Sequence, residues 1–240
     1  MEKTMKSAAT ILIVLSGIAG LFVIDRFTER FNHFSVFRKQ LIYQVTTLAM
    51  ALALMVVNRL IHSDYSSVLR TGDFDAPTEN FGWLGIKDGT PWSESAITFL
   101  FIPLIITTAV VYVQVLKGSG VAAKRIIYVI PAAIILSAFN SLTEEVIFRL
   151  IGIEGLSGVF TIATLAVVSG LWFGIPHYFG TPGKIPGVLM AGFLGWVAAI
   201  SIMETGGFAL AWGIHFVQDV PILTMMLAVA TNPMNNSEIR

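Results

Sequence analysis

The sequence contains no cysteine, and this absence removes several kinds of site at once. Disulfide bonds, thiolate zinc sites and cysteine nucleophiles all need a side chain that the 240-residue chain lacks. Charge is scarce too, because Asp, Glu, Lys and Arg make up only 12% of the residues, and fifteen basic side chains balance fifteen acidic ones. The composition therefore predicts no nucleic-acid partner, since such a partner calls for a basic surface.

Familiar catalytic signatures are missing as well. No glycine-rich phosphate loop follows a strand, no H-E-x-x-H zinc-protease pattern occurs, and no serine-histidine-acid arrangement stands out.

Long apolar runs are what the sequence has in abundance. Hydrophobic residues make up 55% of the chain, and the mean hydropathy is +0.77. The first run could be a signal peptide or a span, but no small-x-small cleavage site follows it, which favours an uncleaved span. The runs are Ala8–Ile24, Leu41–Val57, Ala96–Leu116, Ile126–Phe139 continuing less purely toward Leu156, Val159–Phe179, Ile185–Met203 and Phe208–Ala230.

These runs predict an all-α, polytopic integral membrane bundle of about seven transmembrane helices. We expect one integral-membrane domain over residues 1–240, in which residues 58–94 form a long loop with an interfacial segment. Lys and Arg are more numerous on the side that holds residues 26–39, residues 117–125 and the C-terminus. This bias predicts a multi-pass membrane protein with a cytoplasmic C-terminus, in the cell membrane if the source is a bacterium or an archaeon.

The stretch N-S-L-T-E-E-V-I-F-R-L-I-G, residues 140–152, brings three charges into an otherwise apolar region. A charge at the bilayer centre costs about 2.5 to 3.5 kcal/mol on insertion scales, so such groups usually face a bundle interior or a cavity. Ser141 and Glu144 have capping-box spacing, which predicts that a helix or a kinked continuation begins here with its glutamates in the first turn.

The two glutamates of this stretch have different neighbours. Glu145 and Arg149 are four residues apart, on one helical face, in the order that favours an ion pair. Glu144 lies about 100° around the helix from Glu145 and is left free. The competing interpretation is a capped helix with an interfacial salt bridge, and this stretch alone favours neither.

Three further polar residues interrupt the later runs. His177 lies four residues after Phe173, and His215 and Asp219 form an i, i+4 pair in which the aspartate can hold the imidazole. An interfacial histidine and a polar pair joining two helices are the structural alternatives. If all these groups reach one intramembrane cavity, a carboxylate beside two imidazoles can activate water for hydrolysis, directly or through a metal.

The three motifs in order, "EEVIFR", "FGIPH" and "HFVQD", read E-E-x-x-x-R, F-x-x-x-H and H-x-x-x-N/D. Over residues 140–220 the chain resembles the CPBP family, also called ABI, of intramembrane proteases, which includes the type II CAAX prenyl endopeptidases. The resemblance implies an α-helical membrane fold with a cavity in the bilayer and hydrolysis of peptide bonds. It departs from the prenyl proteases at Asp219, where they usually carry asparagine, because an ionised carboxylate cannot donate a hydrogen bond.

The resemblance also implies roles. Glu144 is the base that activates water, and His177 assists at that water, with Phe173 in support. Glu145 and Arg149 form the supporting ion pair. His215 and Asp219 form the oxyanion side.

The cofactor is either none or a divalent metal such as zinc, for which the candidate ligands are Glu144, His177, His215 and Asp219. The expected partners are the lipid bilayer and a membrane-associated peptide or protein substrate, whether prenylated, lipid-anchored or neither. Two other functions compete with the peptidase. One is a non-catalytic scaffold or immunity protein of the same fold, and the other is a proton-coupled transporter, which lacks the expected paired broken helices.

Overall fold

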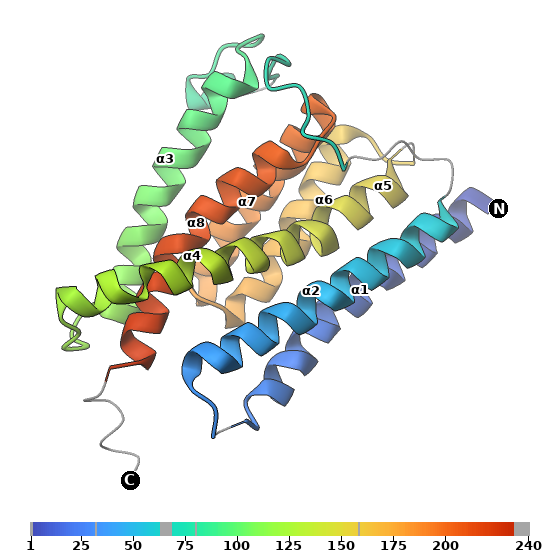
Figure 1. Ribbon diagram of the computed structural model, residues 1–240. Helices are drawn as coiled ribbons and strands as arrows, with labels where there is room; N and C mark the ends of the chain where they lie inside the picture. Colours follow the sequence, from blue (N-terminus) through green and yellow to red (C-terminus); the bar gives the residue numbers. More distant parts are fainter. Residues whose placement is uncertain (1, 32, 63–68, 80, 158, 233–240) are drawn as a thin grey trace.

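The computed structural model describes residues 2–31, 33–62, 69–79, 81–157 and 159–232, and helices account for most of them (Figure 1). Over these residues there is no β-strand, only two isolated bridges. The α-helices are α1 (Glu2–Thr28), α2 (Val36–Ile61), α3 (Trp92–Val111), α4 (Ala123–Glu145), α5 (Gly152–Leu156), α6 (Ile162–Gly174), α7 (Lys184–Thr205) and α8 (Ala209–Ala230). Short 3₁₀ turns lie at Gly82–Leu84 and Ile175–Phe179, and π-helical turns lie at Tyr112–Leu116 and Val146–Ile151.

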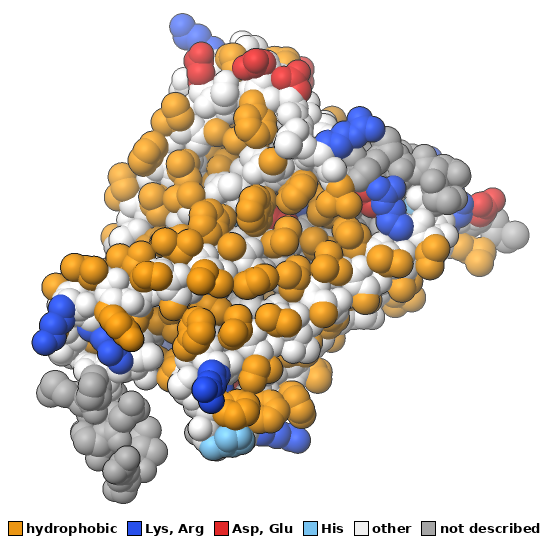
Figure 2. All heavy atoms as spheres, viewed as in Figure 1, with side chains coloured by type: hydrophobic (Ala, Val, Ile, Leu, Met, Phe, Trp, Pro, Cys, Tyr) orange, Lys and Arg blue, Asp and Glu red, His pale blue; other side chains and the backbone are white. Residues whose placement is uncertain are grey.

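Seven helical segments within the described residues are long and apolar enough to cross a membrane. The longest is the 34-residue span Ala123–Leu156, in which α4, a π-helical turn and α5 follow one another without a break. On the face that Figure 2 shows, apolar side chains cover the middle, and charged side chains gather toward the ends. A surface of this kind suits contact with lipid tails. The prediction of an all-α polytopic membrane protein is therefore confirmed.

The expected helix start at Ser141 is wrong. Helix α4 passes through Asn140–Thr143 without interruption, and the Ser141 hydroxyl donates to the carbonyl oxygen of Ser137, four residues earlier, at 2.7 Å. This bond satisfies the hydroxyl inside the helix, so no cap is needed. Glu144 and Glu145 therefore lie at the end of α4 and not in a first turn, and the helix-dipole argument fails. The π-helical turn follows them directly, a feature often found at functional sites.

The long span contacts α1, α2, α6 and α8. Helix α4 packs against α2 and α8, while α1 pairs with α2 and α3 with α8 (Figure 1). Helices α6 and α7 approach closely because glycines face each other. A Cβ atom on Gly174 would lie 2.6 Å from the carbonyl oxygen of Val188 and 2.9 Å from Cα of Gly192. This contact fixes the end of α6 against α7.

Helix α2 extends to Ile61 and α3 begins at Trp92, so the chain between them is shorter at both ends than the loop expected over residues 58–94. Its described part is bonded to the connection between α7 and α8. The Phe208 amide donates to the Arg70 carbonyl at 3.0 Å, and the Asp73 amide donates to the Thr205 carbonyl at 2.8 Å. The interfacial segment and the cytoplasmic C-terminus stay predictions, and residues 63–68, 80 and 233–240 lie outside the described residues.

Candidate active site

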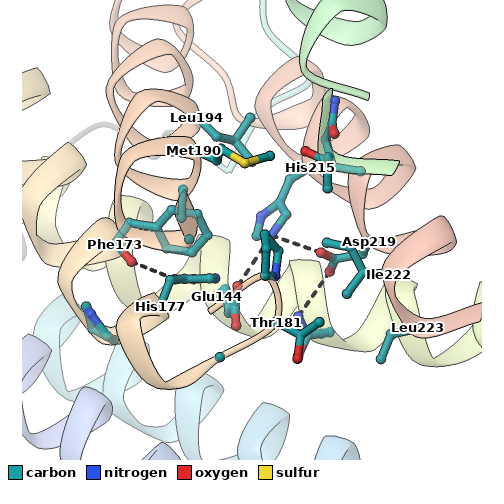
Figure 3. A pocket seen from close by; sticks show the side chains of 18 of the residues that line it. Glu144, Phe173, His177, Thr181, Met190, Leu194, His215, Asp219, Ile222 and Leu223 are labelled. Atoms are coloured by element: carbon teal, nitrogen blue, oxygen red, sulfur yellow. Dashed lines mark hydrogen bonds and ion pairs between the residues drawn. The ribbon is translucent and has the colours of Figure 1, made fainter. Parts of the chain in front are cut away.

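The polar residues singled out from the sequence meet around one cavity of about 670 Å³. Glu144, His177, His215 and Asp219 line it, and Figure 3 shows their side chains converging from α4, from the end of α6 and from α8. The Glu144 side chain is 15% exposed, whereas that of Glu145 behind it is 0% exposed. The two adjacent glutamates therefore differ as the helical spacing predicted, with one at the cavity and one in the protein interior.

Glu145 accepts two hydrogen bonds on a single carboxylate oxygen. Its Oε1 lies 2.9 Å from Nη1 of Arg149, as the i, i+4 spacing predicts, and 2.8 Å from Nδ1 of His215. Glu145 and Arg149 are both fully buried, so this charge pair has no contact with solvent to offset its burial. The second contact joins α8 to the long span.

The sequence offered Asp219 as one partner for the His215 imidazole. Its Oδ1 lies 3.6 Å from Nε2, an ion-pair contact that is longer than a hydrogen bond. Glu145 holds the ring instead, because it reaches Nδ1 across the interface between α4 and α8. Nε2 then faces the cavity carboxylates, with Oε2 of Glu144 at 3.3 Å.

Phe173 determines how His177 is oriented. Nδ1 of His177 lies 2.7 Å from the carbonyl oxygen of Phe173, at the 3₁₀ turn that ends α6. A carbonyl oxygen can only accept, so Nδ1 carries the hydrogen and the neutral ring keeps Nε2 as an acceptor. The F-x-x-x-H spacing thus has a physical reason in one helical turn.

The Phe173 ring also packs against three polar side chains. It lies 4.5 Å from the His177 ring and 5.2 Å from the His215 ring, measured between centroids. The Arg149 guanidinium carbon lies 3.9 Å from the same centroid, which is a cation–π geometry. Phe173 is therefore the apolar centre around which the charged groups are arranged.

Two further residues of the site did not emerge from the sequence. Asn140 donates to Oδ2 of Asp219 at 3.0 Å, and Gln44 on α2 donates to Asn140 at 3.1 Å. Both line the cavity. The available signal was a glutamine inside the otherwise apolar run of α2, whereas Asn140 stood in the charged stretch without an assigned role.

The side chains do not fit a bound metal. No group of three His, Asp or Glu side chains among the described residues is placed to hold one ion. Nδ1 of His177 is bonded to a carbonyl oxygen, and both ring nitrogens of His215 face carboxylates. A zinc site needs three or four such ligands directed at one point. No step described below uses a metal.

Much of the remaining cavity wall is apolar, with side chains from α3, α7 and α8, although Asp25, Gln40, Tyr43, Thr107, Thr181 and Gln218 also line it. The apolar lining includes Ile102, Ile106, Phe193, Leu194, Leu223 and Met226. A polar cluster at the base of an apolar cavity is typical of ligand sites that bury an apolar group and orient it by a few polar contacts.

A multi-pass helical membrane protein with histidines and carboxylates around an intramembrane cavity is the class that this fold and site define. Residues 126–221, about two fifths of the chain, match the family described as type II CAAX prenyl endopeptidase Rce1-like. The match confirms the resemblance to the CPBP family over this region, which contains all six charged site residues and Phe173.

The family is one of membrane proteases, which supports a hydrolase acting on a membrane-associated substrate. A search of curated proteins and a search of solved structures each found no significant match to this chain.

Proposed function

We propose that the chain is an intramembrane endopeptidase that hydrolyses peptide bonds of membrane-associated substrates with water activated by Glu144. The observation that carries the proposal is the division of the glutamate pair. Glu145 is bonded to Arg149 and His215, whereas the Glu144 carboxylate lines the cavity beside two imidazoles. Of the two glutamates, only Glu144 is placed to take a proton from a molecule in the cavity.

A water molecule between Glu144 and His177 would meet two acceptors. The Glu144 carboxylate accepts one of its hydrogens, and the unprotonated Nε2 of His177 accepts the other. The water oxygen then directs a lone pair toward the scissile carbonyl carbon. This arrangement assigns His177 to orienting the water.

His215 supplies the donor for the oxyanion. Its Nδ1–H is donated to Glu145, and its Nε2, when protonated, can donate to the oxygen of the carbonyl under attack. Because Glu145 holds the ring in place before substrate enters, this donor need not reorganise as negative charge develops.

The bond changes balance without another reactant. Water oxygen bonds to the carbonyl carbon as its proton passes to Glu144, and the carbonyl oxygen becomes the oxyanion opposite His215. The oxyanion collapses, the C–N bond breaks, and the proton held by Glu144 passes to the departing amine nitrogen. The products are a new amine and a new carboxylic acid, which keeps the second hydrogen of the water until it releases it to solvent and becomes a carboxylate.

The cavity supports a substrate with an apolar portion. Its volume of about 670 Å³ lies between aliphatic and aromatic side chains of α3, α7 and α8. An apolar peptide segment and a lipid group attached to cysteine would both match this lining. We therefore propose membrane-associated substrates and test a lipid requirement directly.

The test uses purified protein in liposomes with two internally quenched peptides of one sequence, one carrying a farnesyl group on its cysteine. Cleavage in ¹⁸O-enriched water should place one ¹⁸O atom in the new carboxylate, as hydrolysis requires. The Glu144→Ala, His177→Ala double variant should give no product. If wild-type protein cleaves neither peptide, and the double variant still replaces it in the source cell, the chain acts as a scaffold or immunity protein.

A further inference from the structure

A chain of hydrogen-bonded amides runs from α2 through α4 to α8. Nε2 of Gln44 donates to Oδ1 of Asn140 at 3.1 Å, and Nδ2 of Asn140 donates to Oδ2 of Asp219 at 3.0 Å. These contacts join residues 96 and 79 positions apart in the sequence. The chain of amides therefore ends on a carboxylate that lines the proposed active site.

The chemistry of the groups determines which amide atom donates and which accepts in each of these hydrogen bonds. An ionised Asp219 carboxylate has only acceptors, so the NH₂ group of Asn140 must face it. The Asn140 oxygen is thereby turned toward α2, where only the NH₂ group of Gln44 can meet it. Both amide orientations follow from the acid at the end.

Asn140 is the closest hydrogen-bond partner of that acid. His215 lies on the same helix as Asp219, but its Nε2 is 3.6 Å from Oδ1, too far for a hydrogen bond. The two oxygens of the Asp219 carboxylate thus have different neighbours, because Oδ2 is bonded to Asn140 and Oδ1 is turned toward the imidazole. Asn140, more than His215, fixes the rotation of the carboxylate.

Gln44 supports Asn140 from a position where a polar side chain is costly. It lies in the apolar membrane-spanning helix α2 and is only 2% exposed. A buried amide in such a helix is tolerated when it is hydrogen-bonded, and its bond here goes to Asn140. The glutamine is therefore best explained by the asparagine that it orients.

We infer that Asn140 is a positioning residue for Asp219 and that Gln44 orients Asn140. By fixing Oδ1 of Asp219 near Nε2 of His215, the two amides keep the imidazole and the carboxylates around it in one arrangement. The effect on turnover rests on the proposed peptidase function, whereas the effect on the Asp219 carboxylate does not.

The contact itself is tested by infrared spectroscopy on protein with ¹³C-labelled aspartate, reconstituted in liposomes. Subtracting the spectrum of Asp219→Asn isolates the carboxylate band of Asp219. Asn140→Leu should shift that band, and Gln44→Leu should shift it less. Asn58→Leu is the matched control, since Asn58 is another buried amide of α2 that bonds to Thr10 and to the carbonyl of Ile151, outside the cavity. An unchanged band in Asn140→Leu overturns the inference.

The role in turnover is tested with the peptide that wild-type protein cleaves. Asn140→Leu should lower kcat about tenfold with KM within about twofold, and Gln44→Leu should lower kcat about threefold. Asn58→Leu should leave both constants unchanged. Loss of binding instead of kcat in Asn140→Leu would overturn the positioning role.

An exchange of the two groups separates positioning from a merely structural role. Asn140→Asp alone places a second carboxylate beside Asp219 and should reduce kcat further than Asn140→Leu. The double variant Asn140→Asp, Asp219→Asn reverses the donor and the acceptor but keeps their bond, and Gln44 can still donate to position 140. It should recover kcat to within about threefold of wild type.

If the kcat of the double variant Asn140→Asp, Asp219→Asn is no higher than that of Asn140→Asp alone, the inference is contradicted. A shifted band in Asn140→Leu without peptide cleavage by wild type would reject the proposed function, and with it the catalytic role of Asn140, while the contact would stand.

Discussion

Nδ1 of His215 lies 2.8 Å from Oε1 of Glu145, on a glutamate 70 residues earlier in the chain. The same oxygen lies 2.9 Å from Nη1 of Arg149. One buried carboxylate therefore holds both the arginine of its own span and the histidine of α8. Glu145 is therefore the residue that links the structural parts of the site, whereas its neighbour Glu144 faces the cavity.

Removing the His215 ring should slow the reaction without unfolding the protein. His215→Ala takes away the donor proposed for the oxyanion and is expected to lower kcat about 100-fold. This loss of kcat should be smaller than the loss caused by replacing the proposed base, Glu144→Gln, because in His215→Ala the water and its base remain in place. Steady-state kinetics in liposomes measure it, and a full-rate His215→Ala protein would remove this histidine from the mechanism.

The Phe173 ring should matter through packing alone. Phe173→Leu keeps the backbone carbonyl that accepts from His177 but removes the ring that touches three polar side chains. We expect about a tenfold loss of kcat and a lower Tm, whereas His177→Ala should cost at least 100-fold at an unchanged Tm. Tyr178→Phe, on an exposed neighbour outside the cavity lining, serves as the control. Equal kinetic losses in the Phe173 and His177 variants would contradict this separation.

The buried ion pair predicts a large change in stability. Arg149→Met leaves the Glu145 carboxylate buried without its arginine, and we expect the free energy of unfolding to fall by about 3 to 5 kcal/mol. Adding Glu145→Gln removes the unpaired charge and should recover most of that stability, but not the activity. Denaturation in mixed micelles measures the first effect, and peptide cleavage measures the second. A stable Arg149→Met protein would show that the pair is not required for folding.

The close approach of α6 and α7 gives a prediction with a control in the same bundle. Gly174→Ala places a methyl group 2.6 Å from a backbone oxygen of α7, which cannot move aside cheaply, so the end of α6 must shift with His177. We expect a lower Tm and a loss of kcat. Gly213→Ala, two residues before His215, meets nothing within 4 Å and should change neither. Equal behaviour of the two variants would contradict the packing argument.

The sequence predicted the parts of this molecule that depend on local pattern. Seven apolar runs gave the seven spans, and i, i+4 spacing gave the ion pair of Glu145 with Arg149. Ser141 was misread as a cap because its hydroxyl can bond to a backbone carbonyl within a helix as well as to an amide at a helix start. Local spacing alone does not separate these two uses.

Contacts between helices that are distant in the sequence could not be predicted from local pattern. His215 could bond to its neighbour on α8 or to a glutamate of another helix, and only the packing of α4 against α8 decides. Gln44 and Asn140 were missed for the same reason, since each is hydrogen-bonded to a residue more than 70 positions away.

The most direct measurement is the rate at which Glu144→Gln protein cleaves the peptide that wild-type protein cleaves. The substitution keeps the size of the side chain and removes the base, so the rate should fall about 1,000-fold with folding and membrane insertion unchanged. Glu154→Gln is the matched control, because it alters a second buried glutamate of the same span, one that lies outside the cavity and faces Arg59. The control should cleave at the wild-type rate. Peptide cleavage by Glu144→Gln protein at the wild-type rate would contradict the proposed role of Glu144.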